Sequence, residues 1–134
     1  MSRIKICGLR RPEDIAAVNE ARPDYCGFIV EYPKSRRSID RTTLRELVRG
    51  LREKIVPVGV FVNATKELVA ELLEEGTIQI AQLHGQESQE YIQELKVLTE
   101  KPLIQAFSIK SKEDVERARE SVADYILLDQ GSGG

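Results

Sequence analysis

The sequence predicts an α/β fold built on a parallel β-sheet, and three observations indicate it. Short runs rich in β-branched residues alternate with longer amphipathic runs along the 134 residues. The amphipathic runs place their apolar residues three and four positions apart, which is the helical period. No Pro- or Ser-rich linker divides the chain, so a single domain is expected over residues 1–134. Strict alternation of strands and helices favours parallel strands joined by right-handed crossovers.

Six strands are expected where short apolar runs occur, at residues 4–7, 25–30, 56–62, 78–83, 103–107 and 125–129. Five amphipathic helices separate them. The first helix begins near Pro12, because the fixed φ of proline suits a first helical turn. Glu13 and Asp14 follow, and their charges suit the positive end of the helix dipole.

Polar residues mark the starts of the later helices. Asp40 can cap the second helix, and either Asn63 or Thr65 can cap the third. Ser111 followed by Asp114 resembles a capping box at the start of the fifth helix. The second helix shows a clear apolar stripe with spacing i, i+3, i+4, i+7, made of Leu44, Leu47, Val48 and Leu51.

Two architectures fit this alternation. One is an open doubly wound parallel sheet, and the other is a (β/α)8 barrel without its last units. The sequence ends directly after the sixth strand, without a helix to cover that strand. Because parallel sheets are normally covered, the pattern favours an incomplete barrel with strands 1–6 of 8. The open sheet is kept as the alternative.

Composition narrows the function. The 20 Lys and Arg residues nearly balance 22 Asp and Glu residues, which gives a net charge of −2. The chain therefore lacks the excess of positive charge that is typical of nucleic-acid-binding proteins. No apolar run approaches the roughly 20 residues that span a bilayer. Two cysteines and one histidine exclude a disulfide scaffold and a His/Cys zinc site. A strand-like start argues against a signal peptide, so a cytoplasmic protein that acts on a small molecule is expected.

In both architectures the chemistry is found at the carboxyl ends of the strands. Cys7 ends the first strand and, by alternation, shares a face with Lys5. It is either a small buried hydrophobe or a thiolate base, whereas Cys26, inside the second strand, is expected in the core. Asp129 ends the sixth strand. It is either a turn residue before the terminal glycines or a general acid with a raised pKa.

Two further strand ends carry weaker signals. His84 follows the fourth strand, where a structural role is as well supported as a catalytic one. Arg36 and Arg37 lie in the polar loop after the second strand, and a guanidinium there would suit a carboxylate ligand. A phosphate enzyme on an open sheet would need a glycine-rich loop after the first strand, but Gly8 is the single glycine there.

Several segments, in order along the chain, resemble phosphoribosylanthranilate isomerase of the tryptophan branch. They are residues 5–8 (KICG), 24–29 (DYCGFI), 32–37 (YPKSRR), 58–63 (VGVFVN), 82–85 (QLHG) and 127–129 (LLD) with Gly131, Gly133 and Gly134. The resemblance implies a (β/α)8 barrel. It implies the Amadori rearrangement of N-(5-phosphoribosyl)anthranilate to the carboxyphenylamino-deoxyribulose phosphate, without a metal or organic cofactor.

The same resemblance implies roles for single residues. Asp129 matches the general acid, which protonates the furanose ring oxygen, and Cys7 matches the general base, which takes the proton from the sugar C2. Arg37 matches the arginine that faces the anthranilate carboxylate. His84 matches a position that lines the substrate pocket.

The sequence departs from the resemblance in its length. Eight units of about 20–25 residues need some 160–200 residues, and the loops after strands seven and eight bind phosphate in such barrels. Little or no isomerase activity is therefore expected of these 134 residues alone. The alternative is a non-catalytic fragment or assembly module. Exposed edges at the first and sixth strands predict a homo-oligomer.

Overall fold

The computed structural model describes residues 5–84 and 86–129, which form one parallel sheet and five helices. The strands are β1 (Lys5–Cys7), β2 (Tyr25–Val30), β3 (Ser38–Ile39), β4 (Val56–Phe61), β5 (Ile80–Leu83), β6 (Leu103–Ser108) and β7 (Tyr125–Asp129). The helices are α1 (Pro12–Ala21), α2 (Arg41–Arg49), α3 (Lys66–Glu74), α4 (Gln89–Leu98) and α5 (Lys112–Arg119).

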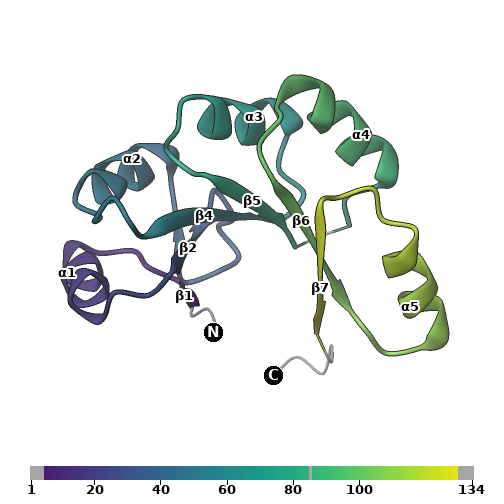
Figure 1. Cartoon of the computed structure of the whole chain (residues 1–134), viewed down its shortest axis with the longest axis horizontal. Coiled ribbons are helices and arrows are strands. Elements are labelled where there is room, and N and C mark those ends of the chain that lie inside the picture. The colour runs from purple at the N-terminus through teal and green to yellow at the C-terminus, as the bar shows by residue number, and fades with distance from the viewer. Residues whose placement is uncertain (1–4, 85, 130–134) are drawn as a thin grey trace.

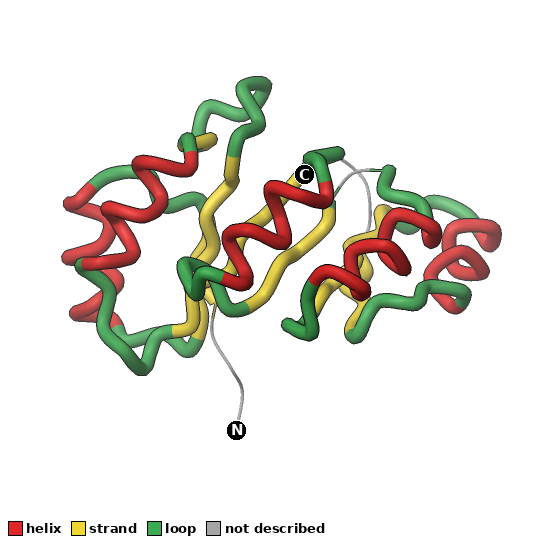
Figure 2. Tube along the Cα trace, turned by 90° about the horizontal axis from the view of Figure 1, so that it is seen from above, coloured by secondary structure: helices red, strands yellow, loops and turns green. Residues whose placement is uncertain are grey.

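The sheet keeps the order of the sequence, and its helices lie on one side. The strand order is β1-β2-β4-β5-β6-β7, with β3 paired to β2 off this path. Figure 1 shows the five helices along the convex side of the curved sheet, and Figure 2 shows helices in front of the strands when that arc is viewed from above. A doubly wound sheet needs helices on both faces and a reversal of strand order. The open-sheet alternative is therefore wrong, and the fold is a parallel α/β half-barrel.

The expected strands are present, with shifted ends. β4 stops at Phe61, β5 begins at Ile80, and β6 extends to Ser108. Ile4, the expected first residue of the first strand, lies outside the described residues. The short strand β3 is absent from the expectation, because its two residues belong to a polar loop in the sequence. It forms where that loop returns alongside β2.

Side chains start the helices largely as predicted. Asp40 accepts a hydrogen bond from the backbone N–H of Thr43 at 2.7 Å, and so caps α2. Thr65, and not Asn63, caps α3. Asn63 instead has a left-handed backbone with φ of 53° and contacts a neighbouring loop.

Two aspartates anchor the turns that lead into α1 and α5. Asp14 accepts backbone N–H groups of Arg10 at 3.0 Å and Arg11 at 3.1 Å. Asp114 accepts the backbone N–H of Lys110 at 2.8 Å. These hydrogen bonds, that of Arg10 foremost at Asp14 and that of Lys110 foremost at Asp114, favour the charged carboxylates and lower the pKa of both groups.

The apolar core lies between the convex face of the sheet and the helices. Alternate residues of the central strands point into it and are fully buried, among them Cys26, Phe28, Phe61, Leu83 and Leu103. The burial of Cys26 is as expected from the sequence. We call the opposite, concave face of the sheet the inner face.

The last strand is exposed on both of its faces. Tyr125, Ile126, Leu127 and Leu128 are 62%, 45%, 44% and 54% exposed. Exposed apolar side chains on an edge strand are open to pairing with further chain. None of the helices in the described part of the chain is both long and apolar enough to span a membrane.

The close packing of Gly59 makes it sensitive to substitution. A Cβ atom there would lie 2.8 Å from Ile78 Cδ1 and 2.9 Å from Phe61 Cε2, and both side chains are fully buried. Gly59→Ala is expected to lower the free energy of unfolding in urea by about 1–3 kcal/mol. Gly50→Ala is the control, because its Cβ would meet nothing closer than 3.5 Å. A loss at Gly50 as large as the loss at Gly59 would contradict this account.

The two anchoring aspartates predict an acid-dependent stability. Because each pKa is lowered in the folded state, their contribution is present above the ordinary aspartate pKa of about 3.9 and is lost as the pH falls through the folded value. Urea unfolding from pH 6 to pH 2.5 is expected to show a shallower acid loss in the Asp14→Asn/Asp114→Asn variant than in the parent. Glu13→Gln is the control, since it removes a charge from the same turn of α1. An unchanged slope in the double variant would refute the assignment.

Candidate active site

The strand register assigns Cys7 and Asp129 to the same face of the sheet. Side chains alternate between the two faces along each strand. Paired residues on neighbouring strands point to the same face, so one face can be followed from β1 to β7. The path runs through Cys7↔Gly27, Gly27↔Val58, Val60↔Gln82, Gln82↔Ile104, Ile104↔Tyr125 and Ser108↔Asp129. Every step along a strand in this path is an even number of residues. Position 129 therefore falls on the inner face with Cys7, at the carboxyl ends of the strands, an edge that we call the mouth.

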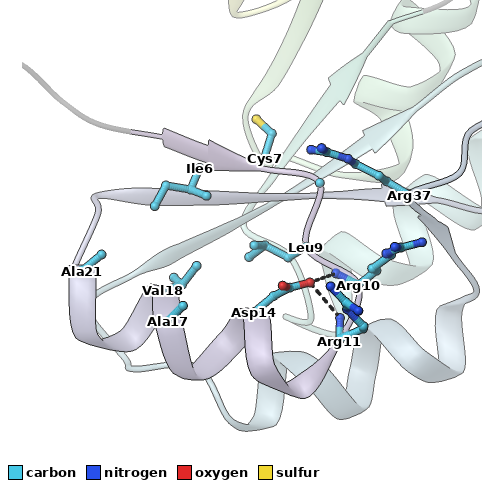
Figure 3. Close-up of a pocket in the computed structure, with 11 residues that line it drawn as sticks. Ile6, Cys7, Leu9, Arg10, Arg11, Asp14, Ala17, Val18, Ala21 and Arg37 are labelled. Atoms are coloured by element: carbon cyan, nitrogen blue, oxygen red, sulfur yellow. Dashed lines mark hydrogen bonds between the residues drawn. The ribbon is translucent and has the colours of Figure 1, made fainter.

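Cys7 lies at the mouth with its side chain exposed. Figure 3 shows its thiol on the side of β1 away from α1. Cys7 also lines a hollow of about 400 Å³ along the free edge of β1. Exposure excludes the interpretation of Cys7 as a buried hydrophobe. The side chain of Lys5, which was expected to share this face, lies outside the described residues.

Arg37 reaches from the loop after β2 to the residue that follows Cys7 (Figure 3). A Cβ atom on Gly8 would lie 2.7 Å from Arg37 Cδ and 2.8 Å from its Nη1, and Gly8 has φ of 80°. Gly8 is thus required both for its backbone conformation and for the approach of the guanidinium. The structure therefore brings Arg37 close to the end of β1, and Cys7 and Arg37 share one wall of the mouth.

A second arginine supports the loop that carries Arg37. Arg10 donates a hydrogen bond from Nη1 to the backbone oxygen of Arg36 at 3.0 Å. The N–H of Arg37 donates to Ser35 Oγ at 3.2 Å, which closes the turn from within. The carboxylate of Asp14 holds the other end of this connection through the backbone N–H of Arg10. Arg36 itself thus takes part in this connection through its backbone oxygen.

His84 lies on a different part of the mouth, directly after β5. Its backbone N–H donates to the oxygen of Phe61 at 2.8 Å, and its ring Nδ1 is 3.2 Å from Gln82 Nε2. Gln82 is 5% exposed and two residues earlier on the same face. The side chain of His84 is exposed, so its other ring nitrogen is open to a ligand.

Glu87, near His84, was not predicted from the sequence, and Asn63 was predicted only as a possible helix cap. The backbone N–H of Asn63 donates to Glu87 Oε2 at 2.8 Å, and Asn63 Oδ1 accepts the N–H of Gln86 at 2.8 Å. We call this reciprocal pair the Asn63–Glu87 bridge. The spacing of Gln82 and His84, i and i+2 on one strand face, is a signal that could have revealed their contact. Nothing comparable in the sequence pairs Asn63 with Glu87.

The structure does not describe some of the predicted site positions. The backbone of Asp129 is described, but its side chain is not. Gly85, Gly131, Gly133 and Gly134 lie outside the described residues. Within residues 5–84 and 86–129, no group of three or more His, Cys, Asp and Glu side chains could hold a metal ion.

Comparison with known proteins gives a consistent match. The sequence matches the family described as N-(5'phosphoribosyl)anthranilate (PRA) isomerase over residues 4–134. It is 43% identical to the N-(5'-phosphoribosyl)anthranilate isomerase of Acetivibrio thermocellus and 41% identical to that of Caldanaerobacter subterraneus subsp. tengcongensis. These matches cover the whole chain, which spans 65% and 66% of the length of the two relatives.

Solved structures agree with this match. The isomerase of Thermus thermophilus is 36% identical with a TM-score of 0.78, over 98% of this chain and 66% of that one. A phosphoribosyl anthranilate isomerase in complex with reduced 1-(o-carboxyphenylamino)-1-deoxyribulose 5-phosphate is 35% identical with a TM-score of 0.82, over 96% of this chain and 65% of that one. Monomers generated from the dimeric Thermotoga maritima isomerase are 34% identical with a TM-score of 0.79, over 96% of this chain and 64% of that one.

A parallel sheet in sequence order, with helices on one side and polar residues at its carboxyl ends, defines part of a (β/α)8 barrel. The match extends over residues 4–134 and includes the segments at residues 5–8, 58–63 and 82–85. The chain belongs to the phosphoribosylanthranilate isomerase family.

The contact between Gly8 and Arg37 predicts that Gly8→Ala moves the Arg37 side chain but lowers stability no more than another substitution of a glycine at positive φ. Gly8→Ala and Gly76→Ala both place a side chain at positive φ, and each is expected to cost about 1 kcal/mol in urea unfolding. The Cβ at Gly76 would meet nothing within 4 Å. Because the flexible Arg37 side chain gives way, its Nε–H resonance is expected to shift in Gly8→Ala alone. A much larger stability loss in Gly8→Ala would instead mean that backbone, and not the guanidinium, moves.

Proposed function

We propose that this chain supplies the acid–base residues of a phosphoribosylanthranilate isomerase, which catalyses the Amadori rearrangement of N-(5-phosphoribosyl)anthranilate in tryptophan biosynthesis. The observation that carries the proposal is the register that assigns Cys7 and Asp129 to one face at the mouth. Family membership supports it, as does the similarity to an isomerase structure that holds a reduced ribulose phosphate compound.

Asp129 acts as the general acid. Its proton goes to the ring oxygen of the furanose as the bond between C1 and that oxygen breaks. The lone pair of the anthranilate nitrogen forms the C1=N bond of a protonated Schiff base. A carboxyl group suits this role because its protonated form can donate a proton to the ring oxygen.

Cys7 acts as the general base. Its thiolate removes the proton from C2, and the electron pair of that C–H bond forms a C1=C2 double bond while the C1=N pair returns to nitrogen. The resulting enolamine becomes the ketone when C1 gains a proton and the C2 hydroxyl loses one. Acid and base therefore belong on opposite walls of the mouth, and the register supports this division because Cys7 and Asp129 end the first and last strands of the sheet.

Arg37 and His84 bind the substrate in this proposal. The guanidinium of Arg37 can hold the anthranilate carboxylate with two hydrogen bonds. His84, exposed at the mouth, offers a ring nitrogen to a hydroxyl of the sugar. The reaction exchanges protons and electrons within one substrate, so it needs neither a metal nor an organic cofactor.

The 134 residues by themselves have little or no isomerase activity in this proposal. In (β/α)8 barrels the loops after strands seven and eight bind the substrate phosphate. The relatives are about half as long again as this chain, and binding of a remote phosphate helps to orient the reacting atoms. A partner that supplies two further βα units would pair with the exposed strand β7.

The second candidate is a folded module without catalysis that associates through its strand edges. The four exposed apolar residues of β7 favour it, because an uncovered edge can pair with a second copy of the chain. Sedimentation at high concentration separates the candidates. A homo-oligomer without activity supports the module, and a strict monomer argues against association.

The fluorescence of phosphoribosylanthranilate tests the catalytic roles. The chain is assayed alone and after mixing with the last two βα units of the Thermotoga maritima isomerase. Cys7→Ser and Asp129→Asn are each expected to lower kcat of the mixture by about 10²–10⁴-fold. Cys26→Ser and Asp124→Asn are the matched controls, because Cys26 is in the core and Asp124 accepts the backbone N–H of Leu103. Equal losses in the controls, or no loss in the site variants, would show the assignment to be wrong.

A further inference from the structure

Glu87 is a buried carboxylate at the mouth that the proposed mechanism does not use. It is 7% exposed, and its Oε2 accepts the backbone N–H of Asn63, 24 residues earlier, at 2.8 Å. A buried carboxylate is costly without hydrogen-bond donors. Its placement between two loops of the mouth therefore calls for a function that offsets this cost.

Asn63 completes the connection in the opposite direction. Its Oδ1 accepts the N–H of Gln86 at 2.8 Å, so each loop donates one backbone hydrogen bond to a side chain of the other. Asn63 also has φ of 53°, a left-handed conformation that asparagine adopts more readily than most non-glycine residues. The two hydrogen bonds of the bridge favour that conformation.

A third strand is attached to the same bridge. Gln105, in the middle of β6, is 4% exposed and donates from Nε2 to the backbone oxygen of Glu87 at 3.1 Å. The loops after β4 and β5 are thus joined to each other and to β6.

His84 lies between β5 and the bridge. Its backbone N–H is fixed to Phe61 of β4, and its ring Nδ1 faces the amide of Gln82 at 3.2 Å. The bridge begins two residues after His84, at Gln86. The chain on either side of His84 is therefore held, by the β-sheet before it and by the bridge after it.

We propose that the Asn63–Glu87 bridge positions His84 for substrate binding, so that Asn63 and Glu87 are positioning residues and not catalytic ones. The inference rests on the proposed function for what His84 binds. The hydrogen bonds of the bridge do not depend on the proposed function. Loss of either side chain frees the loop after β5, and the imidazole then samples several orientations.

The single histidine of the chain makes a direct test available. The imidazole resonances of His84 and the exchange of backbone amides are recorded by NMR on the whole chain. Asn63→Gly keeps the left-handed backbone and removes the acceptor, and Glu87→Ala removes the other acceptor. Each is expected to lower the exchange protection of the amides at positions 63 and 86 at least tenfold and to shift or broaden the His84 resonances. Glu87→Gln keeps an acceptor oxygen and is expected to restore most of both.

Ser88→Ala is the matched control. Ser88 is next to Glu87 and caps α4 by accepting the N–H of Tyr91 at 3.0 Å, so its loss destabilises the region without touching the bridge. The His84 resonances are expected to stay unchanged in this variant. If the bridge variants unfold the chain, Asn63→Asp, which keeps the size of the side chain and adds a like charge beside Glu87, takes their place. Unchanged His84 resonances in the folded bridge variants, or an equal change in Ser88→Ala, would overturn the proposal.

Kinetics of the reconstituted mixture supply the second readout. The bridge variants are expected to raise KM at least tenfold with kcat within about threefold of the parent, and to add nothing further in a His84→Ala background. A fall in kcat at unchanged KM, or full additivity with His84→Ala, would contradict a positioning role. An inactive parent mixture refutes the proposed function, while the NMR experiment still decides whether the bridge holds His84.

Discussion

The structure depends on covering a parallel sheet with helices on one face alone. Five successive crossovers of the same hand keep the strands in sequence order and place every helix on the convex side (Figure 1). Alternation then separates the two faces. Residues such as Phe28 and Phe61 enter the core, and the positions between them line the inner face. None of the described helices covers that face, and the polar residues at its carboxyl edge, such as Cys7 and His84, are exposed. The same constraint that builds the core therefore also builds the mouth.

The sequence was sufficient for the features that arise within one element. The helical stripe from Leu44 to Leu51, the cap at Asp40 and the capping box at Ser111 depend on neighbours a few residues away. The contrast between the two cysteines was predictable in part. The core position of Cys26 was expected, whereas Cys7 was left open between a buried hydrophobe and a thiolate base. Cys26 pairs with Ile6, the residue before Cys7, so alternation places the two cysteines on opposite faces. Local pattern and alternation decide such features, and tertiary contacts did not override them.

Other features depend on contacts between distant segments and escaped prediction. Strand β3 exists only because β2 lies beside it, and Asn63, one of two candidate caps for α3, instead contacts Glu87. The approach of Arg37 to Gly8 joins the loops after two strands, and a glycine in a sequence does not reveal which side chain will cover it. A single sequence carries no direct record of such pairings, so the wall of the mouth is less predictable than the strands that support it.

Two separate sets of contacts hold the two walls of the mouth, and the sheet sets the distance between them. On one wall, Asp14, Arg10 and the backbone of Arg36 hold the loop that carries Arg37. On another, the Asn63–Glu87 bridge holds the loop of His84. The spacing between the two walls depends on the strand pairings from β1 to β5, each of which adds its own twist. A change of twist in those pairings moves Cys7 relative to His84. Local hydrogen bonds can therefore fix each side chain, but strands that pair with the free edges of β1 and β7 would have to fix the distance across the mouth.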